Sequence, residues 1–442
     1  MTSPQKLPSP YIPNTPTDKQ LMLDAIGVSS AEELFEDIPK EHRISKLNMP
    51  EAVAELDLIR QLNTLAESNV YPGEYSSFLG AGVYRHYTPS IVQPLMMRGE
   101  FLTSYTPYQP EVSQGTLQFT YEFQTAVCHL FDMEVANAGM YDGSTSVAEG
   151  ALMACRVTGK SKIAVLDSVS PLYKSVLEGY LTAQNIAIYS VTGNKPNIDT
   201  DTACLIVQSP NFLGYLEDLD ALVKSAHNSD ALALVSTDPI SCGLLKPPGS
   251  FGADIVTGEG QALGVPATFG GPYVGLFSCK QQYLRQMPGR IVGKTNDSEN
   301  RPAYVLTLQA REQHIRRERA TSNICTSTAL IALGATIYLA TLGKQGLQET
   351  SRQIYDKAHY AASEIAKLPQ YKVHNSQAFF QEFVIECPNS PESVNDHLLT
   401  HKVIGGLDVS SIINNGMLLC FSEMNTKKEI DHLVQTLKLF GK

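Results

Sequence analysis

The sequence lacks paired cysteines, an excess of positive charge and any apolar run long enough to cross a membrane. Its eight cysteines stand singly, mostly in apolar stretches, which indicates reduced, buried thiols in a cytoplasmic protein. Lysine and arginine number 34 against 45 acidic residues, so the net charge of -11 argues against a nucleic-acid or anionic-membrane partner. Residues 1–19 have no apolar region like that of a secretory signal. The longest apolar run, 329–342, is interrupted by glycine and threonine and predicts a buried helix.

Length and composition predict a large core divided between domains. With 442 residues, of which 43% are hydrophobic and 18% charged, the chain is expected to form two or three domains. Residues 1–80 are expected to form a proline-rich arm followed by helices, the longer helix running from Pro50 to about Glu67. Residues 81–325 form a predicted large α/β domain, and residues 326–442 form a smaller C-terminal α/β domain.

The middle of the chain alternates between short apolar runs and helical patterns. Strands are expected at 163–166, 186–191, 203–207, 231–235, 255–256 and 273–277, with helices at 171–184 and 217–227. Short, continuous apolar strands separated by helices indicate a mostly parallel, doubly wound sheet that is covered on both faces. Ligands of such sheets bind at the carboxyl ends of the strands.

One helix in this region begins with a pattern suited to an anion. Ser146 and Glu149 have the spacing of a capping box, and Gly143, Ser144 and Thr145 stand just ahead of the helix. Free backbone N–H groups and the helix dipole at such a place attract negative charge. A plain helix cap that binds no ligand explains the same residues, and both interpretations stay open at this point.

Two strand ends carry further polar residues. Asp238 follows the strand at 231–235, and the loop DIVTGEGQALGVPATFGGP, residues 254–272, follows the next strand. This layout resembles the type I pyridoxal-phosphate enzymes, in which an aspartate pairs with the pyridine nitrogen and a lysine of the loop attaches the cofactor. Here the lysine position reads Gln261-Ala262, and neither side chain has an amine. The resemblance therefore implies a fold of this type that binds no cofactor covalently. We call the following group the cradle: Ser144, Thr145, Asp238, Gln261 and Ala262.

The glycines of the same loop also resemble a dinucleotide-binding fingerprint. Gly258 and Gly260 have the right spacing, but the third glycine, Gly264, comes one position late. The loop also follows a late strand rather than the first one, so the pattern does not favour a nicotinamide or flavin site.

Two segments outside the predicted strands are rich in groups that could form a contact. The loops between residues 71 and 114 suit either a subunit contact and substrate wall or packing on their own domain. Their polar and aromatic candidates are Arg85, His86, Tyr105, Tyr108, Gln109 and Glu111. A basic cluster further on could receive an acidic partner or form a solvated face. Its members are Arg311, His314, Arg316, Arg317 and Arg319.

Several longer runs carry a more specific resemblance. They include FLGAGVYRHYTPS, TSYTPYQPEVSQGTLQF, YDGSTSVAEGALMA, GEGQALGVPATFGGPYVG and REQHIRRERATSNICT, and they are spread over nearly the whole chain. The chain resembles the P-protein family of the glycine cleavage system, in the form that is divided between two subunits, and specifically its subunit 1 chains. The resemblance implies a pairing with subunit 2, which carries pyridoxal phosphate on its lysine. It also implies glycine as substrate and the lipoyl group of H-protein as acceptor of the aminomethyl group, with no activity expected from this chain alone.

The resemblance leaves three roles for a chain without the lysine. Because type I active sites lie between subunits, the candidates in the loops between residues 71 and 114 could reach across and complete the subunit 2 site. Alternatively the chain is a purely structural or docking partner, with Arg316, Arg317 and Arg319 receiving H-protein. The third possibility is a self-sufficient enzyme that uses another lysine, for which the candidates are Lys246, Lys280 and Lys294.

Overall fold

The computed structural model describes residues 11–44, 48–50, 52–324, 327–374 and 377–440, and the chain forms two compact units, Met1–Val70 and Tyr71–Lys442. The first unit contains the helices α1 (Pro16–Ile26) and α2 (Glu55–Ala66) and two short 3-10 turns. α1 begins with a capping box between Thr15 and Asp18. α2 begins at Glu55, so the prediction of a helix from Pro50 was wrong at its start. Neither helix has a buried residue.

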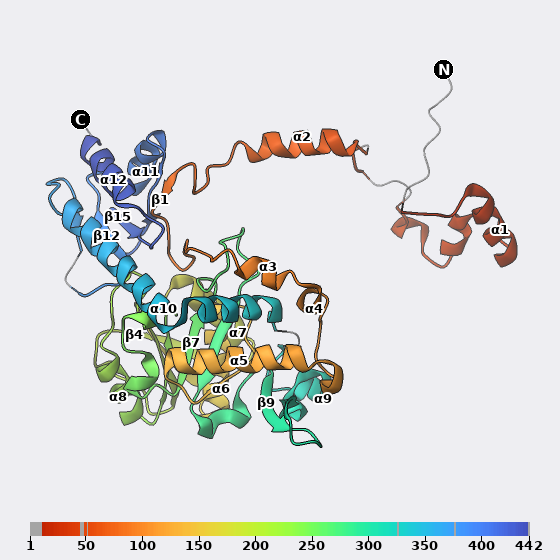
Figure 1. Ribbon diagram of the computed structural model, residues 1–442, viewed down its shortest axis with the longest axis horizontal. Helices are drawn as coiled ribbons and strands as arrows, with labels where there is room; N and C mark the ends of the chain where they lie inside the picture. Colours follow the sequence, from red (N-terminus) through yellow and green to blue (C-terminus); the bar gives the residue numbers. More distant parts are fainter. Residues whose placement is uncertain (1–10, 45–47, 51, 325–326, 375–376, 441–442) are drawn as a thin grey trace. The chain divides into compact units, whose positions relative to one another are not determined.

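A seven-stranded sheet forms the centre of the second unit (Figure 1). Its order is β2 (Val135–Ala136), β8 (Gly275–Cys279), β7 (Ile255–Glu259), β6 (Leu232–Ser236), β5 (Thr202–Gln208), β3 (Lys162–Leu166) and β4 (Ala187–Val191). The strands β3 to β7 are parallel to one another, which confirms the predicted α/β fold. β8 pairs with β7 and with β2 in antiparallel fashion, so the sheet is mixed at that edge.

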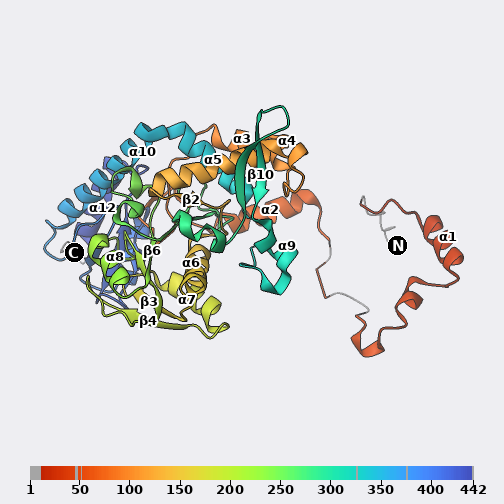
Figure 2. The ribbon, with the colours of Figure 1, turned by 90° about the horizontal axis from the view of Figure 1, so that it is seen from below.

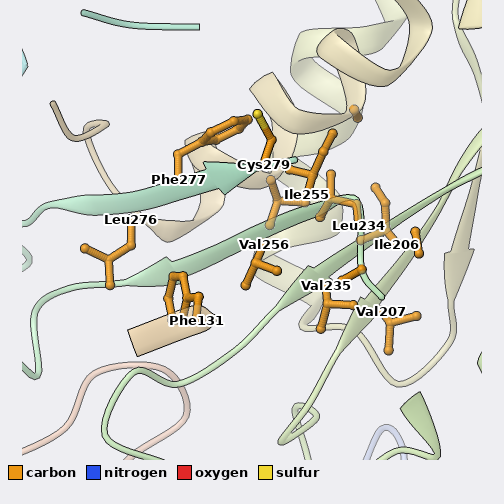
Figure 3. Packing of buried hydrophobic residues seen from close by; sticks show 14 of the residues in the cluster. Phe131, Ile206, Val207, Leu234, Val235, Ile255, Val256, Leu276, Phe277 and Cys279 are labelled. Carbon is orange, nitrogen blue, oxygen red and sulfur yellow. The ribbon is translucent and has the colours of Figure 1, made fainter. Parts of the chain in front are cut away.

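Both faces of this sheet are apolar, as the continuous hydrophobic runs predict. Along neighbouring strands, the side chains alternate between the two faces in register (Figure 3). One face presents Ile206, Leu234, Ile255 and Phe277, and the other presents Val207, Val235, Val256 and Leu276. Helix α6 (Gly143–Thr158) packs on the first face, because a Cβ at Gly150 would meet Leu234 and Ile255. Phe131 of α5 (Gln114–Phe131) lies against the other face (Figure 3).

The helices complete the layers on the sheet. α7 (Pro171–Thr182) packs beside α6, and α8 (Leu219–Asn228) packs against β6. α10 (Ala329–Ile365) runs beside α5 in both views (Figures 1 and 2) and bends at Gly343, whose φ of 58° is not helical. By length and composition alone α10 would be able to span a membrane, yet its first half buries Ala332, Leu333, Ala335 and Tyr338 in the core of the unit.

The C-terminal part builds a second sheet. Its order is β11 (Lys372–Val373), β12 (Glu382–Glu386), β15 (Gly416–Cys420) and β14 (Leu407–Asp408), all antiparallel. The second half of α10, α11 (Pro391–Thr400) and α12 (Lys427–Leu439) contribute to one apolar cluster with this sheet. A short strand β1 (Ser76–Ser77) pairs in parallel with β13 (Val403–Ile404) and so attaches the chain just ahead of residue 81 to this part.

One hairpin was not predicted from the sequence. β9 (Ile291–Asn296) and β10 (Pro302–Thr307) pair along six residues each. Only the start of β9 is buried, and its second half reads Lys294, Thr295 and Asn296, all exposed. The short helices α3 (Val92–Met96), α4 (Gly99–Leu102) and α9 (Gln313–Arg316) were missed as well, because four or five residues give no periodic signal.

Candidate functional site

The cradle residues come together at the carboxyl ends of the parallel strands. Two adjoining cavities lie there, one of about 200 Å³ and one of about 40 Å³. Ser144 lines the larger cavity, and Asp238, Gln261 and Ala262 line the smaller one. Glu259, the last residue of β7, lines both. The topology thus brings four of the five cradle residues to one place, as expected for ligands of a parallel sheet, while Thr145 is not among the lining residues of these two cavities.

The position of the missing lysine is held by Gln261, which is 1% exposed. Its Nε2 donates to the carbonyl oxygens of Tyr84 at 2.9 Å and Val265 at 2.7 Å. Its Oε1 accepts from the backbone N–H of Tyr84 at 2.9 Å. Ala262 beside it is 3% exposed and contributes only a methyl group. The amide of Gln261 is therefore fully engaged in fixing backbone, and no amine faces the cavity from either residue.

Helix α6 begins three residues earlier than its predicted cap, and a different residue caps it. The capping box joins Asp142 and Thr145: the Asp142 carboxylate accepts from the Thr145 N–H at 2.7 Å. The predicted box of Ser146 and Glu149 is therefore wrong. Glu149 lies one turn further on and accepts from the Ser322 hydroxyl at 2.7 Å. The sequence offered two residues with capping potential, and spacing alone did not separate them.

The first backbone N–H of α6 is not free. Gly143 donates to Oε2 of Glu259 at 2.8 Å. The hydroxyl of Ser144, the residue predicted beside a phosphate, donates to Oδ1 of Asp142 at 2.8 Å. The N–H groups of Gly143 and Thr145 and the Ser144 hydroxyl are thus engaged with two carboxyl groups of the same chain.

Asp238 is the residue predicted to face a pyridine nitrogen, and it is satisfied within the chain. Its Oδ1 accepts from the Ile240 N–H at 2.8 Å, and its Oδ2 accepts from Nε2 of Gln381 at 2.9 Å. Burial raises its pKa, against the opposing charge of His86. Gln381 lies just ahead of β12 and is 2% exposed, with its Oε1 left without a partner among the described residues.

Acidic side chains line the two cavities. Burial raises the pKa of Glu259 to about 8 and that of Glu382 to about 7. Asp142 and Asp238 complete the set of acidic lining residues. Of the described residues that line the two cavities, none is lysine, arginine or histidine. This donor set does not fit a phosphate-bearing cofactor held through an imine, because both the amine and the positive charge for the phosphate are missing.

Residues 81–87, the covering segment, lie over the cradle. At its start, Ala81 donates its N–H to Oε1 of Glu382 at 2.6 Å, and the Tyr84 hydroxyl donates to Oε2 at 2.8 Å. At its end, Nδ1 of His86 pairs with Oε2 of Glu423 at 2.8 Å. These contacts join the covering segment to β12 and to the chain just ahead of α12.

Within the covering segment the two predicted contact residues behave differently. The His86 side chain is 3% exposed and points inward to Glu423. Arg85 is partly exposed and makes no ion pair or side-chain hydrogen bond within the described part of the chain. Arg85 is thus available for a contact that a second chain would supply, whereas His86 serves to anchor the segment.

The other predicted contact segment lies on a different surface. Tyr105 is 80% exposed and Tyr108 is 45% exposed, and Gln109 and Glu111 are exposed as well. The Tyr108 hydroxyl accepts from Nη2 of Arg290 at 3.2 Å, and its ring lies 5.1 Å from the ring of His314. The structure therefore presents these aromatic groups to solvent on a support of Arg290 and His314. Arg290 is 5% exposed, and its role here was not predicted from the sequence.

The basic cluster divides into a buried and an exposed part. Arg311 donates to the carbonyl oxygens of Met287 and Gly289, and burial lowers its pKa to about 10. It holds the hairpin base and is not a free surface charge. The remaining arginines, 316, 317 and 319, are exposed.

None of the alternative lysines lines the cavities. Nζ of Lys280 binds Oδ1 of Asp254 at 2.6 Å, and Asp254 precedes β7, so this amine lies at the opposite end of the strand from Glu259. The Lys280 side chain is 31% exposed, and its amine is paired with Asp254. Lys246 lies 4.3 Å from the Phe251 ring, and Lys294 is exposed on β9. Among the residues described, no three histidine, cysteine or acidic groups are arranged to hold a metal ion.

The fold and the cradle define the class of protein. The chain has the type I pyridoxal-phosphate-enzyme fold, with the cradle at the strand ends and no lysine in it. A sphingosine-1-phosphate lyase of Burkholderia pseudomallei matches with a TM-score of 0.64 and 13% identity, over 90% of this chain and 92% of the lyase. A glutamate decarboxylase of Lactobacillus brevis matches with a TM-score of 0.65 and 13% identity, over 91% of this chain and 97% of the decarboxylase. These two show the fold alone.

Closer relatives define the family. The family model of the glycine cleavage system P-protein matches residues 9–437. A chain of Desulfitobacterium hafniense named "Probable glycine dehydrogenase (decarboxylating) subunit 1" is 48% identical, over 96% of this chain and 98% of its own length. A chain of the same name from Thermomicrobium roseum is 47% identical, over 97% and 99%. A crystal structure of the glycine decarboxylase P-protein in inhibitor-bound form has a TM-score of 0.90 and 41% identity, over 97% of this chain and 99% of the chain in that structure. The chain belongs to the glycine cleavage system P-protein family.

Several residues of the site were not singled out from the sequence. They are Asp142, Tyr173, Gln208, Glu259, Gln381, Glu382 and Glu423. Glu259 had a usable signal, since an acidic residue stood at the carboxyl end of a buried strand, two positions before Gln261. Glu382 and Glu423 had none, because they come from the C-terminal part of the chain and reach the site only through folding.

Proposed function

We propose that this chain is the cofactor-free subunit of a two-chain glycine decarboxylase in the cytoplasm. In this proposal a subunit 2 carries pyridoxal phosphate on its own lysine, and glycine loses its carboxylate there as carbon dioxide. The remaining aminomethyl group then passes to the lipoyl group of H-protein. Family membership supports the pairing, since the similar curated chains are named as subunit 1. The observation that carries the proposal is Gln261, whose amide makes three hydrogen bonds at the lysine position.

The cofactor supplies the sink for the electrons left when carbon dioxide departs, and in this proposal it sits on the partner. This chain contributes surface to the partner's site. The exposed rings of Tyr105 and Tyr108 would cover apolar area and exclude water, with Gln109 and Glu111 as polar contacts beside them. Arg85, whose guanidinium group has no side-chain partner among the described residues, would orient a carboxylate. His86 would act through the covering segment, since it is buried against Glu423.

A second role is supported by a different surface. The exposed arginines 316, 317 and 319 form a positive face on a chain whose net charge is -11. Such a face suits an acidic partner, and H-protein is the partner proposed for it. Charge reversal at these arginines should raise the apparent KM for H-protein if they dock it. An unchanged KM would leave the completion of the partner's site as the role to pursue.

The pairing is tested by two measurements on the purified chain. The first is visible absorbance with excess pyridoxal phosphate, for this chain alone and for its mixture with subunit 2. The second is release of carbon dioxide from glycine in the same samples. The proposal expects no protein-linked imine band from this chain alone and turnover only in the mixture. An imine band with turnover from this chain by itself would overturn the proposal and direct attention to Lys246, Lys280 and Lys294.

A further inference from the structure

Glu259 fills the end of the cradle that faces helix α6. Its Oε2 accepts from the Gly143 N–H at 2.8 Å, and its Oε1 accepts from the Gln261 N–H at 2.9 Å. A Cβ placed on Gly143 would lie 3.0 Å from the Cβ of Glu259 and 2.5 Å from the hydroxyl oxygen of Tyr173. The Glu259 carboxyl group thus takes the position in front of the first N–H of α6, and Tyr173 lies close beside Gly143.

Three hydrogen-bond donors of this helix end are engaged within the chain. The N–H of Gly143 binds Glu259, and the N–H of Thr145 binds Asp142 at 2.7 Å. The hydroxyl of Ser144 also binds Asp142. A phosphate group needs several such donors at once, and a helix N-terminus is an anion site only while its N–H groups are free. An incoming phosphate would have to displace the Glu259 carboxyl group.

The rest of the cradle is filled in the same way. Nε2 of Gln381 donates to Oδ2 of Asp238. The amide of Gln261 is bound to the backbone N–H and the backbone carbonyl of Tyr84. The side chains of Ser144, Asp238 and Gln261, which the resemblance places at the cofactor, are thus directed to other groups of the chain. The missing lysine is therefore one of several features of this cradle that oppose cofactor binding. The others are the hydrogen bonds that engage Asp238, Gln261 and the start of α6.

We propose that Glu259 closes this cradle to phosphate-bearing ligands, so that returning a lysine to the loop does not by itself return cofactor binding. The carboxyl group stands in for the phosphate: it accepts the same N–H group and occupies the same place at the positive end of α6. This inference concerns the chain's own cradle and holds whether or not the chain completes a partner's site.

The test places a lysine at either loop position, with and without Glu259. The variants are Gln261→Lys and Ala262→Lys, each alone and each combined with Glu259→Ala. Every protein is incubated with pyridoxal phosphate and reduced with borohydride, and the label on the peptide that contains residues 261–262 is quantified by mass spectrometry. We expect background labelling in both single variants. In at least one combined variant the labelling should increase on the order of tenfold, because a bound phosphate gains about one hydrogen bond to the freed N–H group. The label on the Lys280 peptide is the internal control and should not change.

The variant Glu259→Gln tests whether the space that the side chain fills, or the charge of its carboxyl group, keeps phosphate out. It keeps the size of the side chain and one oxygen acceptor, so its combination with the lysine variants should stay at background. A second readout requires no lysine: inorganic phosphate should raise the Tm of the Glu259→Ala protein and leave that of the wild-type chain unchanged. Labelling of a single lysine variant at the level of its combined variant would overturn the proposal. So would a Glu259→Ala protein, folded by circular dichroism, that gains neither label nor stabilisation by phosphate.

Discussion

Gln261 and Tyr84 are paired through the backbone N–H and the backbone carbonyl of Tyr84, although 177 residues separate them in the sequence. The Gln261 amide accepts from the N–H and donates to the carbonyl oxygen, each at 2.9 Å. A carboxamide can do this because it carries a donor and an acceptor side by side, whereas an ammonium group carries donors only. The residue at the lysine position thus replaces a bond to a cofactor with a bond to the covering segment.

The first prediction concerns this pair. Gln261→Ala should lower the free energy of unfolding by about 1–3 kcal/mol, because part-buried backbone groups of Tyr84 and Val265 lose their partners. Hydrogen exchange of the Tyr84 amide should become faster while the amides of α5 keep their protection. Urea denaturation and exchange mass spectrometry measure the two effects.

Gln118→Ala is the matched control for that variant. Gln118 is exposed on α5 and donates only to Glu122, four residues away. Its loss should change the unfolding free energy by less than about 0.5 kcal/mol. If Gln261→Ala has no larger effect than Gln118→Ala, the covering segment is held by Glu382 and Glu423 alone.

The central sheet could be predicted because its signal is local. β3, β5, β6 and β7 are largely buried, mainly apolar runs between turns, β4 at the edge of the sheet is only partly buried, and each of the five was placed within one or two residues at its start. The direction of β8 was not predictable in this way, since a buried antiparallel strand has the same apolar run as a parallel one. The edges of the three proposed domains, at 80 and 325, remain a prediction, and residues 325–326 lie outside the described residues.

The candidate site could be predicted only in its outline. The absence of an amine at Gln261-Ala262 is a property of the sequence itself, and Asp238 follows from its place after a buried strand. The filling of the cradle is a property of the fold, because Ala81 meets Glu382 and His86 meets Glu423 over separations of 301 and 337 residues. No spacing rule connects positions that far apart. For the same reason, the sequence did not predict that His86 points inward to Glu423 while the neighbouring Arg85 has no side-chain partner among the described residues.

The second prediction concerns the exposed aromatic segment. Tyr108→Ala should weaken association with subunit 2, or lower turnover of the mixture, by about tenfold or more, as for a central aromatic residue of an interface. The stability of the isolated chain should change little, because the Tyr108 ring is 45% exposed and its hydroxyl makes one bond of 3.2 Å. Titration of subunit 2 with the variant, followed by carbon dioxide release, measures both effects.

Leu399→Ala serves as the control for that experiment. Leu399 is 39% exposed on α11 and belongs to no segment assigned to the partner. Its mixture with subunit 2 should keep wild-type turnover. Wild-type turnover and wild-type affinity of the Tyr108→Ala chain would remove Tyr108 from the partner's site.

The third prediction uses the pair of His86 and Glu423. Burial lowers the pKa of His86, but the hydrogen bond and the charge of Glu423 raise it by more, leaving it above 6.5. Burial raises the pKa of Glu423, but the bond to His86 leaves it below 4.5. The stabilisation from His86 is therefore complete below pH 6.5 and is lost as the pH rises through its folded pKa. The stabilisation from Glu423 is present above pH 4.5 and is lost as the pH falls through the folded pKa of Glu423.

Glu423→Gln tests this window. The variant keeps the size of the side chain and removes the charge, so the free energy of unfolding should fall most near about pH 6 and less near about pH 9. Chemical denaturation of both proteins at the two pH values gives the difference. Glu349→Gln, which breaks an exposed pair with Arg352, should show no comparable pH dependence. An equal loss at both pH values would mean that the pair contributes as a neutral hydrogen bond only.

The last prediction concerns the pH dependence that Glu259 imposes on the whole chain. Burial raises the pKa of this carboxyl group from its usual 4.5 to about 8, against the opposing backbone hydrogen bonds of Gly143 and Gln261. The folded chain therefore binds a proton that the unfolded chain has already released at neutral pH. Its contribution to stability falls as the pH rises from about 4.5 to about 8 and is constant outside that range. Glu259→Gln does not titrate, so its stability relative to the wild-type chain should rise across this range, by on the order of 1.4 kcal/mol for each unit of pKa shift. Denaturation of the two proteins between about pH 5 and about pH 9 measures the difference. A constant difference would show that the carboxyl group ionises in the folded chain as it does in water, and that the two backbone N–H groups hold it as a carboxylate despite its burial.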